Sequence, residues 1–319
     1  MKSSNARAQR TEMTQRTPFR LGLIGFGEVG STLGQGFHDE GLIEIAAYDK
    51  YAFDGPFGAL IQSRAAKAGV PLVRSPEELA ARSQVIVGVT PGSASIESAQ
   101  AFAPYLNASH MFVDFASSTP KVKQTVGTYL KGSGARIADA SIMGTPHTDG
   151  HRLPMLASGP AAQDFLALMN PWGLKIEYVE GDLGAASGIK IMRSVIAKGL
   201  EALLVECMLG ASHYGIDAAV LASFDKFMAT RSFTSMANFL ITTGSVHAER
   251  RSHEAEMSAD ALIEAGIEPI MTRATAKRLA WVHQLGMKAH FGGEVPKSYT
   301  DSVAAMETLL RGARETKPN

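Results

Sequence analysis

Three cations and a hydroxyl lie close together in one segment that has a helical pattern. Lys190, Ser194 and Lys198 are spaced by four, so they share one face of that helix, and Arg193 lies beside Lys190. In a cleft, the neighbouring cations and desolvation lower the pKa of each amine. A lysine brought towards neutrality acts as a general base or acid. The alternative from spacing alone is a surface lysine on an amphipathic helix.

Glycines with GxGxxG spacing form a second stretch suited to chemistry, Gly25-Phe26-Gly27-Glu28-Val29-Gly30, which lies between an apolar run and a helical pattern. Gly25 allows a tight turn, Gly27 lets the backbone approach a pyrophosphate, and Gly30 lets the helix pack against the sheet. The helix N-terminus then faces the phosphates. The stretch predicts a dinucleotide site, and the alternative is a glycine-rich turn in another kind of α/β protein.

The choice of cofactor depends on Asp49, which ends the second apolar run. A carboxylate at this place accepts hydrogen bonds from the ribose hydroxyls and repels a 2′-phosphate, which favours NAD over NADP. Lys50 weakens this argument, because a lysine turned inward could pair with that phosphate. We therefore expect Asp49 and Lys50 both to belong to the cofactor site.

Short apolar runs alternate with helical patterns from residue 21 to about 178, which indicates a parallel sheet covered on both faces. The expected strands are residues 21–25, 43–49, 85–89, 111–114, 136–140, 153–158 and 175–178. After residue 181 only helical segments follow: 185–214, 217–227, 231–243, 246–265, 269–285 and 298–314. We expect a doubly wound, mostly parallel α/β Rossmann domain over residues 19–180 and an all-α domain for substrate binding and oligomerisation over 181–319.

Composition narrows the possible functions. The chain has 319 residues, of which 31 are basic and 31 acidic, and this zero formal net charge argues against a nucleic-acid surface. The only cysteine is Cys207, so an intrachain disulfide is impossible. No apolar run approaches the length of a membrane helix. Residues 1–18 are expected to form a disordered extension, with a transit peptide as the alternative, and the mature protein is expected in the cytoplasm.

At four places the chain resembles the β-hydroxyacid dehydrogenase superfamily, which includes 6-phosphogluconate dehydrogenase and 3-hydroxyisobutyrate dehydrogenase. These places are the glycine turn, Asp114-Phe115-Ala116-Ser117-Ser118-Thr119-Pro120, Asp139-Ala140-Ser141-Ile142-Met143-Gly144, and the segment from Gly184 to Lys190. They span residues 20–200 in the family's order. The C-terminal part looks closer to a bacterial subgroup of 6-phosphogluconate-dehydrogenase-like proteins whose substrate is unassigned.

The resemblance implies roles for individual residues. Lys190 matches the family's catalytic lysine, which handles the proton of the substrate hydroxyl. Gly144 matches a glycine of the substrate-binding loop, where Met143 replaces the usual serine. Ser117 matches a residue that contacts the nicotinamide ribose or the substrate, and Thr90-Pro91 match the backbone that passes the nicotinamide.

The chain also departs from the family's pattern. Ser194 stands where the family commonly has Asn, Arg193 where it often has Asn or His, and Ala197 where 6-phosphogluconate dehydrogenase has Glu. We therefore do not expect 6-phosphogluconate dehydrogenase activity. Arg193 is a candidate fork for a substrate carboxylate, and a salt bridge to Glu201 or another acid is the alternative.

These observations predict a dehydrogenase that passes hydride from a small, anionic β-hydroxyacid to NAD(P), with Lys190 as base and with Ser117, Met143, Gly144, Arg193, Ser194 and Lys198 in the substrate site. The rivals are an imine or keto reductase on the same fold and a non-catalytic NAD(P)-binding protein. No metal is expected, since no helix aligns His147 with His151. We expect a homodimer or larger homo-oligomer, because the family usually pairs the long amphipathic faces of its helical domain between subunits. No nucleic-acid or membrane partner is expected.

Overall fold

The computed structural model describes residues 16–315 and divides the chain into two compact units, Met1–Val195 and Ile196–Asn319. The extension expected over residues 1–18 lies outside the described residues, except for residues 16–18. The division between the units falls inside helix α9 (Ala185–His213), beyond residue 180 where the sequence analysis places the boundary. The reason is that the first turn of α9 is hydrogen-bonded to the sheet of the first unit.

Unit 1 is built on an eight-stranded sheet with the order β3-β2-β1-β4-β5-β6-β7-β8. Neighbouring strands are parallel except β6 and β7, which are antiparallel, so β7 and β8 run opposite to the others. The mostly parallel, doubly wound sheet expected from the sequence is confirmed. The strands are β1 (Leu21–Ile24), β2 (Ile45–Tyr48), β3 (Leu72–Val73), β4 (Val85–Gly88), β5 (Met111–Asp114), β6 (Arg136–Ile142), β7 (Pro154–Ser158) and β8 (Lys175–Tyr178).

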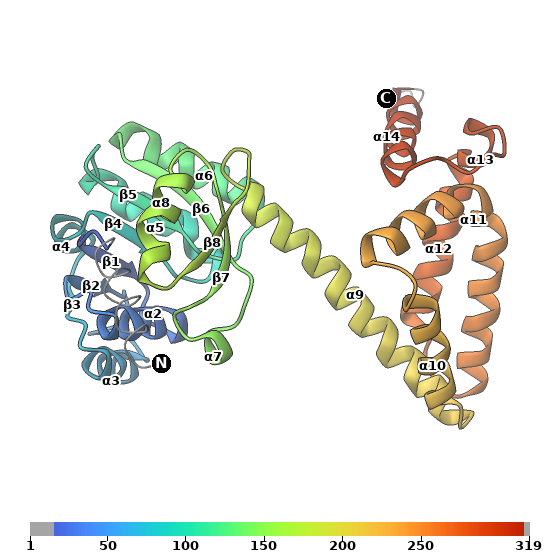
Figure 1. Ribbon diagram of the computed structural model, residues 1–319, viewed down its shortest axis with the longest axis horizontal. Coiled ribbons are helices and arrows are strands. Elements are labelled where there is room, and N and C mark those ends of the chain that lie inside the picture. The colour runs from blue at the N-terminus through green and yellow to red at the C-terminus, as the bar shows by residue number, and fades with distance from the viewer. Residues whose placement is uncertain (1–15, 316–319) are drawn as a thin grey trace, which may run out of the picture. The chain divides into compact units, whose positions relative to one another are not determined.

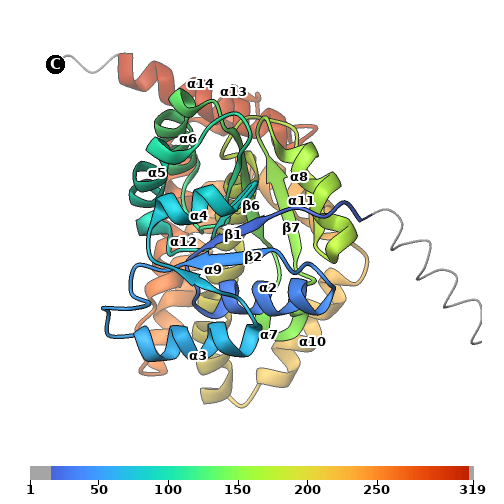
Figure 2. The same ribbon diagram turned by 90° about the vertical axis from the view of Figure 1, so that its left-hand side faces the viewer.

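Helices cover both faces of this sheet (Figures 1 and 2). Alternate residues of each strand face opposite sides, so that in β1 Leu23 joins one buried cluster and Ile24 the other. The first cluster includes residues of α2 (Glu28–Asp39), α3 (Gly58–Ala68) and α8 (Ala162–Met169), and the second includes residues of α4 (Pro76–Arg82), α5 (Ser95–Phe102) and α6 (Pro120–Leu130). A short helix, α7 (Pro146–Asp149), lies between β6 and β7.

Among its described residues unit 2 contains helices joined by turns and no strand, as expected. After α9 come α10 (Asp217–Met228), α11 (Phe233–Glu264), α12 (Ile270–Gln284), α13 (Met287–His290) and α14 (Tyr299–Glu315). The sequence predicts a break near Gly244, but α11 continues through it and only kinks at His247. Hydrogen bonds of Arg251 connect the two sides of this kink. Its guanidinium donates to the carbonyl of Leu240 and to the Thr243 hydroxyl.

The described part of unit 2 has a small core. Its buried hydrophobic cluster contains Ala248, Val282, Met287 and Ala305, which come from α11 to α14. No residue of α10 is buried. No helix among residues 16–315 is both long and apolar enough to cross a membrane.

Candidate active site

The glycine turn between β1 and α2 has the geometry that its sequence predicts. Gly25 has φ +90°, a backbone conformation that favours glycine. A Cβ atom at Gly30 would lie 2.2 Å from the carbonyl oxygen of Gly25, so only glycine lets α2 pack against the turn. A Cβ at Gly27 would meet nothing within 4 Å. Gly27 is the N-cap of α2 and offers no side-chain cap, which leaves the first N–H groups of the helix available to an anion.

Asp49 joins this turn to the end of β2. One carboxylate oxygen accepts a 2.8 Å hydrogen bond from the backbone N–H of Phe26, and the other accepts a 2.9 Å bond from the N–H of Tyr51. Lys50 beside it forms a 3.0 Å ion pair with Glu97, and this hydrogen bond raises the pKa of the Lys50 amine. The lysine that could have paired with a 2′-phosphate is therefore already paired with a carboxylate.

A pocket of 360 Å³ opens between these two features, which is within the usual size range of ligand sites. Gly25, Gly27, Asp49, Lys50, Thr90 and Pro91 all line it. The Thr90 hydroxyl is buried and has no hydrogen-bond partner among the described residues. An unpartnered donor, an open glycine and an uncapped helix in one place fit the phosphates and ribose of a dinucleotide. Glu28 is exposed at the start of α2, whereas the Phe26 ring is buried in the core, where the partly buried Val29 also packs.

The first turn of α9 is hydrogen-bonded to strands β6 and β7 of the sheet. Ala186 N–H donates to the Ser158 hydroxyl at 3.0 Å, and Ser187 N–H donates to an Asp139 carboxylate oxygen at 2.9 Å. A carboxylate at a helix N-terminus is favourable because of the helix dipole. Gly184 makes the approach possible, since its φ is +102° and a Cβ there would lie 2.8 Å from Pro120 Cα at the start of α6.

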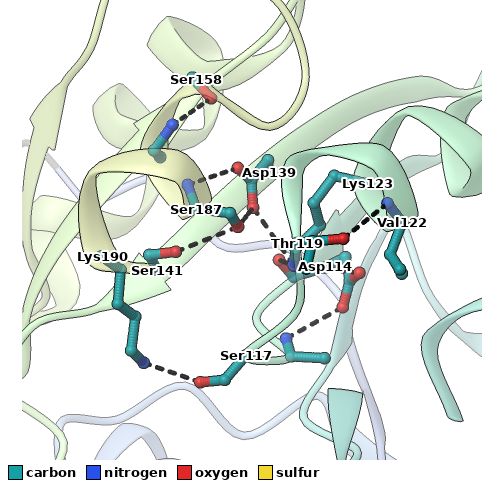
Figure 3. Close-up of polar contacts among 12 residues, drawn as sticks. Asp114, Ser117, Thr119, Val122, Lys123, Asp139, Ser141, Ser158, Ser187 and Lys190 are labelled. Carbon is teal, nitrogen blue, oxygen red and sulfur yellow. Dashed lines mark hydrogen bonds and ion pairs between the residues drawn. The ribbon is translucent and has the colours of Figure 1, made fainter. Parts of the chain in front are cut away.

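Buried charges lie directly beneath this turn (Figure 3). Asp114 on β5 and Asp139 on β6 are register partners, so their carboxylates are neighbours on one face of the sheet. The Lys123 amine from α6 forms ion pairs with both, at 3.0 and 3.2 Å, and donates a 2.8 Å hydrogen bond to the Asp114 carbonyl. The Lys123 side chain is only 1% exposed. Without that ammonium, two carboxylates would face each other away from water.

Lys190 follows one turn after Ser187 on α9. Its amine donates a 2.8 Å hydrogen bond to the Ser117 hydroxyl, in the loop between β5 and α6 (Figure 3). Partial burial lowers the pKa of the Lys190 amine, the positive charge of Lys123 lowers it further, and the Asp139 carboxylate opposes the shift. The geometry therefore brings together two residues that the sequence places in the site, Lys190 and Ser117.

The other predicted substrate-site residues make different contacts. Met143 and Gly144 follow β6, and a Cβ at Gly144 would lie 2.3 Å from an Asp149 carboxylate oxygen, so this glycine is needed for close packing of the loop. The Ser194 hydroxyl donates to the Lys190 carbonyl at 3.0 Å. Arg193 is exposed. Lys198 is in unit 2 and lines a different pocket, with Glu201 and Glu206.

Sequence reasoning missed Lys123, Asp139 and Ser187 as site residues. One signal could have found Lys123: in α6 the buried residues are Lys123, Val126 and Leu130, at spacings of three and four. A lysine in phase with the apolar residues of an amphipathic helix needs a buried acidic partner. The identity of that partner follows only from the register of β5 and β6.

Two domain families match the chain. The family described as the NAD binding domain of 6-phosphogluconate dehydrogenase matches residues 20–168, and a domain of unknown function (DUF1932) matches residues 211–282. The first match contains the glycine turn, Asp49, Ser117 and Lys123. The second lies within the helical unit.

Two curated proteins are similar over most of the chain. An uncharacterized 28.5 kDa protein of Methanothermus fervidus is 26% identical over 80% of this chain and 96% of its own length. The mitochondrial 3-hydroxyisobutyrate dehydrogenase of Drosophila melanogaster is 22% identical over 71% of this chain and 68% of its own.

Solved structures share the fold. A conserved protein of unknown function, described as structurally similar to 3-hydroxyacid dehydrogenases, is 25% identical over 83% of this chain and 98% of its own, with a TM-score of 0.58. An imine reductase variant from Myxococcus stipitatus in complex with NAD⁺ is 20% identical over 92% of this chain and 100% of its own, with a TM-score of 0.70. The chain thus carries a domain of the family described as the NAD binding domain of 6-phosphogluconate dehydrogenase, followed by a DUF1932 domain, and these matches together with the dehydrogenase relative support its resemblance to the β-hydroxyacid dehydrogenase superfamily.

Proposed function

We propose that this protein oxidises the hydroxyl group of a small, anionic β-hydroxyacid, with NAD as hydride acceptor and Lys190 as general base. The observation that carries the proposal is the partly buried Lys190 amine, held 2.8 Å from the Ser117 hydroxyl. Hydroxyacid dehydrogenases and imine reductases both occur among its relatives and fold neighbours, so oxidoreductase chemistry suits the fold.

Proton transfer requires Lys190 in its neutral form. Burial and the charge of Lys123 lower the pKa of this amine, which increases the neutral fraction at a given pH. A neutral amine that donates one hydrogen to Ser117 keeps its lone pair for the substrate hydroxyl. The amine takes the hydroxyl proton while the carbon-bound hydrogen departs with its electron pair and the C=O bond forms. The nicotinamide, when bound, supplies the hydride acceptor.

The preference for NAD rests on the paired charges beside the pocket. Asp49 presents a carboxylate where a 2′-phosphate would add two negative charges, and Lys50 is held by Glu97. Relatives of this fold occur with NAD⁺ and with NADPH, so the fold itself does not select the cofactor. The charge of Asp49 is the feature that favours NAD in this chain.

The experiment is turnover on a panel of β-hydroxyacids with NAD and NADP, by wild type and by Lys190→Ala. We expect the variant to lose about 10²–10⁴-fold in turnover with little change in cofactor affinity. Lys131→Ala is the control, since Lys131 is an exposed lysine of unit 1 outside the predicted site, and it should retain activity. Unchanged turnover in Lys190→Ala would remove the lysine from the mechanism.

The imine reductases found among the fold neighbours justify cyclic imines in the same panel. Reduction of imines without oxidation of any hydroxyacid would replace the proposed reaction by C=N reduction. Tight NAD binding without turnover on either class would indicate a non-catalytic cofactor-binding protein.

We also propose that unit 2 pairs with a second copy of the chain. Ile196, Leu200, Leu203 and Cys207 follow one another on α9 at spacings of four, three and four, and all are exposed. The buried cluster of unit 2 is small, and a second copy would cover these exposed apolar side chains.

Light scattering after gel filtration tests this pairing. Wild type is expected to be a dimer or larger, and Leu200→Glu/Leu203→Glu to be a monomer with a native circular dichroism spectrum. A monomeric wild type at micromolar concentration would refute the pairing, as would a dimer that survives the double substitution.

A further inference from the structure

The buried group beneath α9 is larger than a helix cap requires. Asp139 alone satisfies the Ser187 N–H, at 2.9 Å, and also accepts a 2.7 Å bond from the Ser187 hydroxyl. The Ser187 hydroxyl lies 3.2 Å from that of Ser141 as well. Lys123 and Asp114 are not needed for this cap, yet they bring a full ion pair into the core at the place where Lys190 emerges.

We infer that Lys123 and Asp139 are positioning residues for Lys190, because Asp139 holds the turn of α9 from which Lys190 projects and Lys123 lies between Asp139 and Asp114. This inference rests on the proposed function, because it concerns the proton that Lys190 exchanges. Lys123 acts through space, and Asp139 acts through the first turn of α9.

The geometry supports the two roles separately. Asp139 holds Ser187, and Ser187 lies three residues before Lys190, so the acid fixes the turn from which the amine projects. Lys123 lies between two carboxylates and does not contact α9 by any hydrogen bond or ion pair among the described residues. Its effect on Lys190 is therefore a matter of charge.

The charged groups around Lys190 come from three elements of unit 1 that lie beneath the first turn of α9. Strand β5 supplies Asp114, α6 supplies Lys123 and β6 supplies Asp139, while Ser117 is the neutral partner of the amine. On α9 itself Arg193 is exposed. Of these groups Lys123 lowers the pKa of Lys190 and Asp139 raises it, so the two substitutions have opposite expected signs.

The experiment measures the titration of Lys190 without relying on turnover. Trace acetylation by acetic anhydride between pH 6 and 11, followed by mass spectrometry, reports the neutral fraction of each lysine. Lys198 on the same helix serves as an internal reference. Asp139→Asn should increase the labelling of Lys190 at pH 8 relative to Lys198 by about threefold, since the carboxylate no longer favours the ammonium.

Loss of Lys123 should have the reverse effect. Lys123→Met alone leaves two buried carboxylates and endangers the fold, so the informative variant is Lys123→Met/Asp114→Asn, with Asp114→Asn as its control. Labelling of Lys190 at pH 8 should fall about threefold or more in the double variant and stay near wild type in the control. Lys123→Arg, which keeps the positive charge, should restore labelling close to wild type.

Failure of the inference differs from failure of the proposed function. If both Lys123→Met/Asp114→Asn and Asp139→Asn leave the labelling of Lys190 unchanged in folded protein, Lys123 and Asp139 only stabilise the fold. A shift of the same sign in both variants would also overturn the electrostatic account. If labelling shifts as expected while Lys190→Ala retains full turnover, the charge relationship stands and the catalytic role of Lys190 fails.

Discussion

The carboxyl edge of the sheet in unit 1 carries two sites that are built in opposite ways. At β1, β2 and β4 the site is made by side chains that are missing: Gly25 turns the chain, Gly27 leaves open space, and Gly30 admits the helix. At β5, β6 and β7 the site is made by charged side chains packed in the core, with Lys123 between Asp114 and Asp139. The first presents backbone to a ligand, and the second holds a reactive side chain in place.

The difference has an energetic consequence. Polar groups at the glycine site, such as Lys50 and Glu97, are exposed, and solvent screens their interaction. Those at the lysine site are buried, so each is costly without its partner. Substitutions at the two sites should therefore separate into losses of binding and losses of stability.

The largest effect is expected from Lys123→Met. Removing the ammonium leaves two neighbouring buried carboxylates, and we expect the free energy of unfolding to fall by about 3–5 kcal/mol. Urea denaturation of the cofactor-free protein measures it. At the glycine site, Lys50→Met breaks an exposed, solvent-screened ion pair and should change the free energy of unfolding far less. Similar losses in the two variants would mean that burial does not distinguish the sites.

The glycine site could be predicted from the sequence more fully than the lysine site, because its residues are neighbours in the chain. The glycine turn is contiguous, and each glycine has a local reason, so its geometry could be stated in advance. The lysine site joins residues 114, 123, 139 and 187, which come from two strands and two helices. Asp114 and Asp139 meet only because β5 and β6 pair in that register. No local sequence pattern determines this register, so the partners of Lys123 could not be named from the sequence.

The fold shows the same limit. Strands and helices with clear periodicity were predicted, whereas β3 was missed because its two residues, Leu72 and Val73, are too few for a pattern. The continuous α11 was predicted as two helices because Gly244 suggested a break. There the surrounding contacts of Arg251 outweigh the local preference of one glycine.

Two substitutions within the glycine turn, at Gly30 and Gly27, should separate a loss of stability from a loss of cofactor binding. Gly30→Ala places a methyl group 2.2 Å from the Gly25 carbonyl, and the overpacking should cost about 1–3 kcal/mol in the cofactor-free protein. Gly27→Ala meets open space, so it should cost at most about 1 kcal/mol, through a weaker helix cap. Its main effect should be about tenfold or more in NAD affinity, because the methyl group fills space that the cofactor needs. Thermal unfolding and calorimetric titration measure the two quantities. A large loss of stability in Gly27→Ala would contradict this division.

A smaller effect is expected at Asp49. Asp49→Asn keeps an oxygen to accept one backbone N–H bond and removes the negative charge beside the ribose site. The ratio of NAD to NADP affinity should fall by about tenfold, since the repulsion of a 2′-phosphate is relieved. Lys50→Met is the control and should change the ratio little, because Lys50 is paired with Glu97. A ratio that depends on Lys50 and not on Asp49 would reverse the assignment of cofactor preference.

The smallest effect is expected from Lys190→Met. Unlike the other substitutions, it should increase the free energy of unfolding. Burial lowers the pKa of the folded Lys190 amine below that of the unfolded chain, so the folded state binds this proton less tightly. The resulting cost is fully present below the folded pKa and declines as pH rises through it towards the unfolded value. Lys190→Met removes this cost, and we expect a gain of up to about 1 kcal/mol at pH 7 that shrinks by pH 10.

Urea denaturation of wild type and Lys190→Met at both pH values measures this gain. A residue kept for packing should stabilise the fold, whereas one kept for its chemistry is retained at some cost to stability. The Lys190–Ser117 hydrogen bond is the competing contribution, and it acts in the other direction with less dependence on pH. If Lys190→Met is less stable than wild type by the same amount at pH 7 and pH 10, that bond dominates. Lys190 would then belong with Lys123 among the residues that stabilise unit 1.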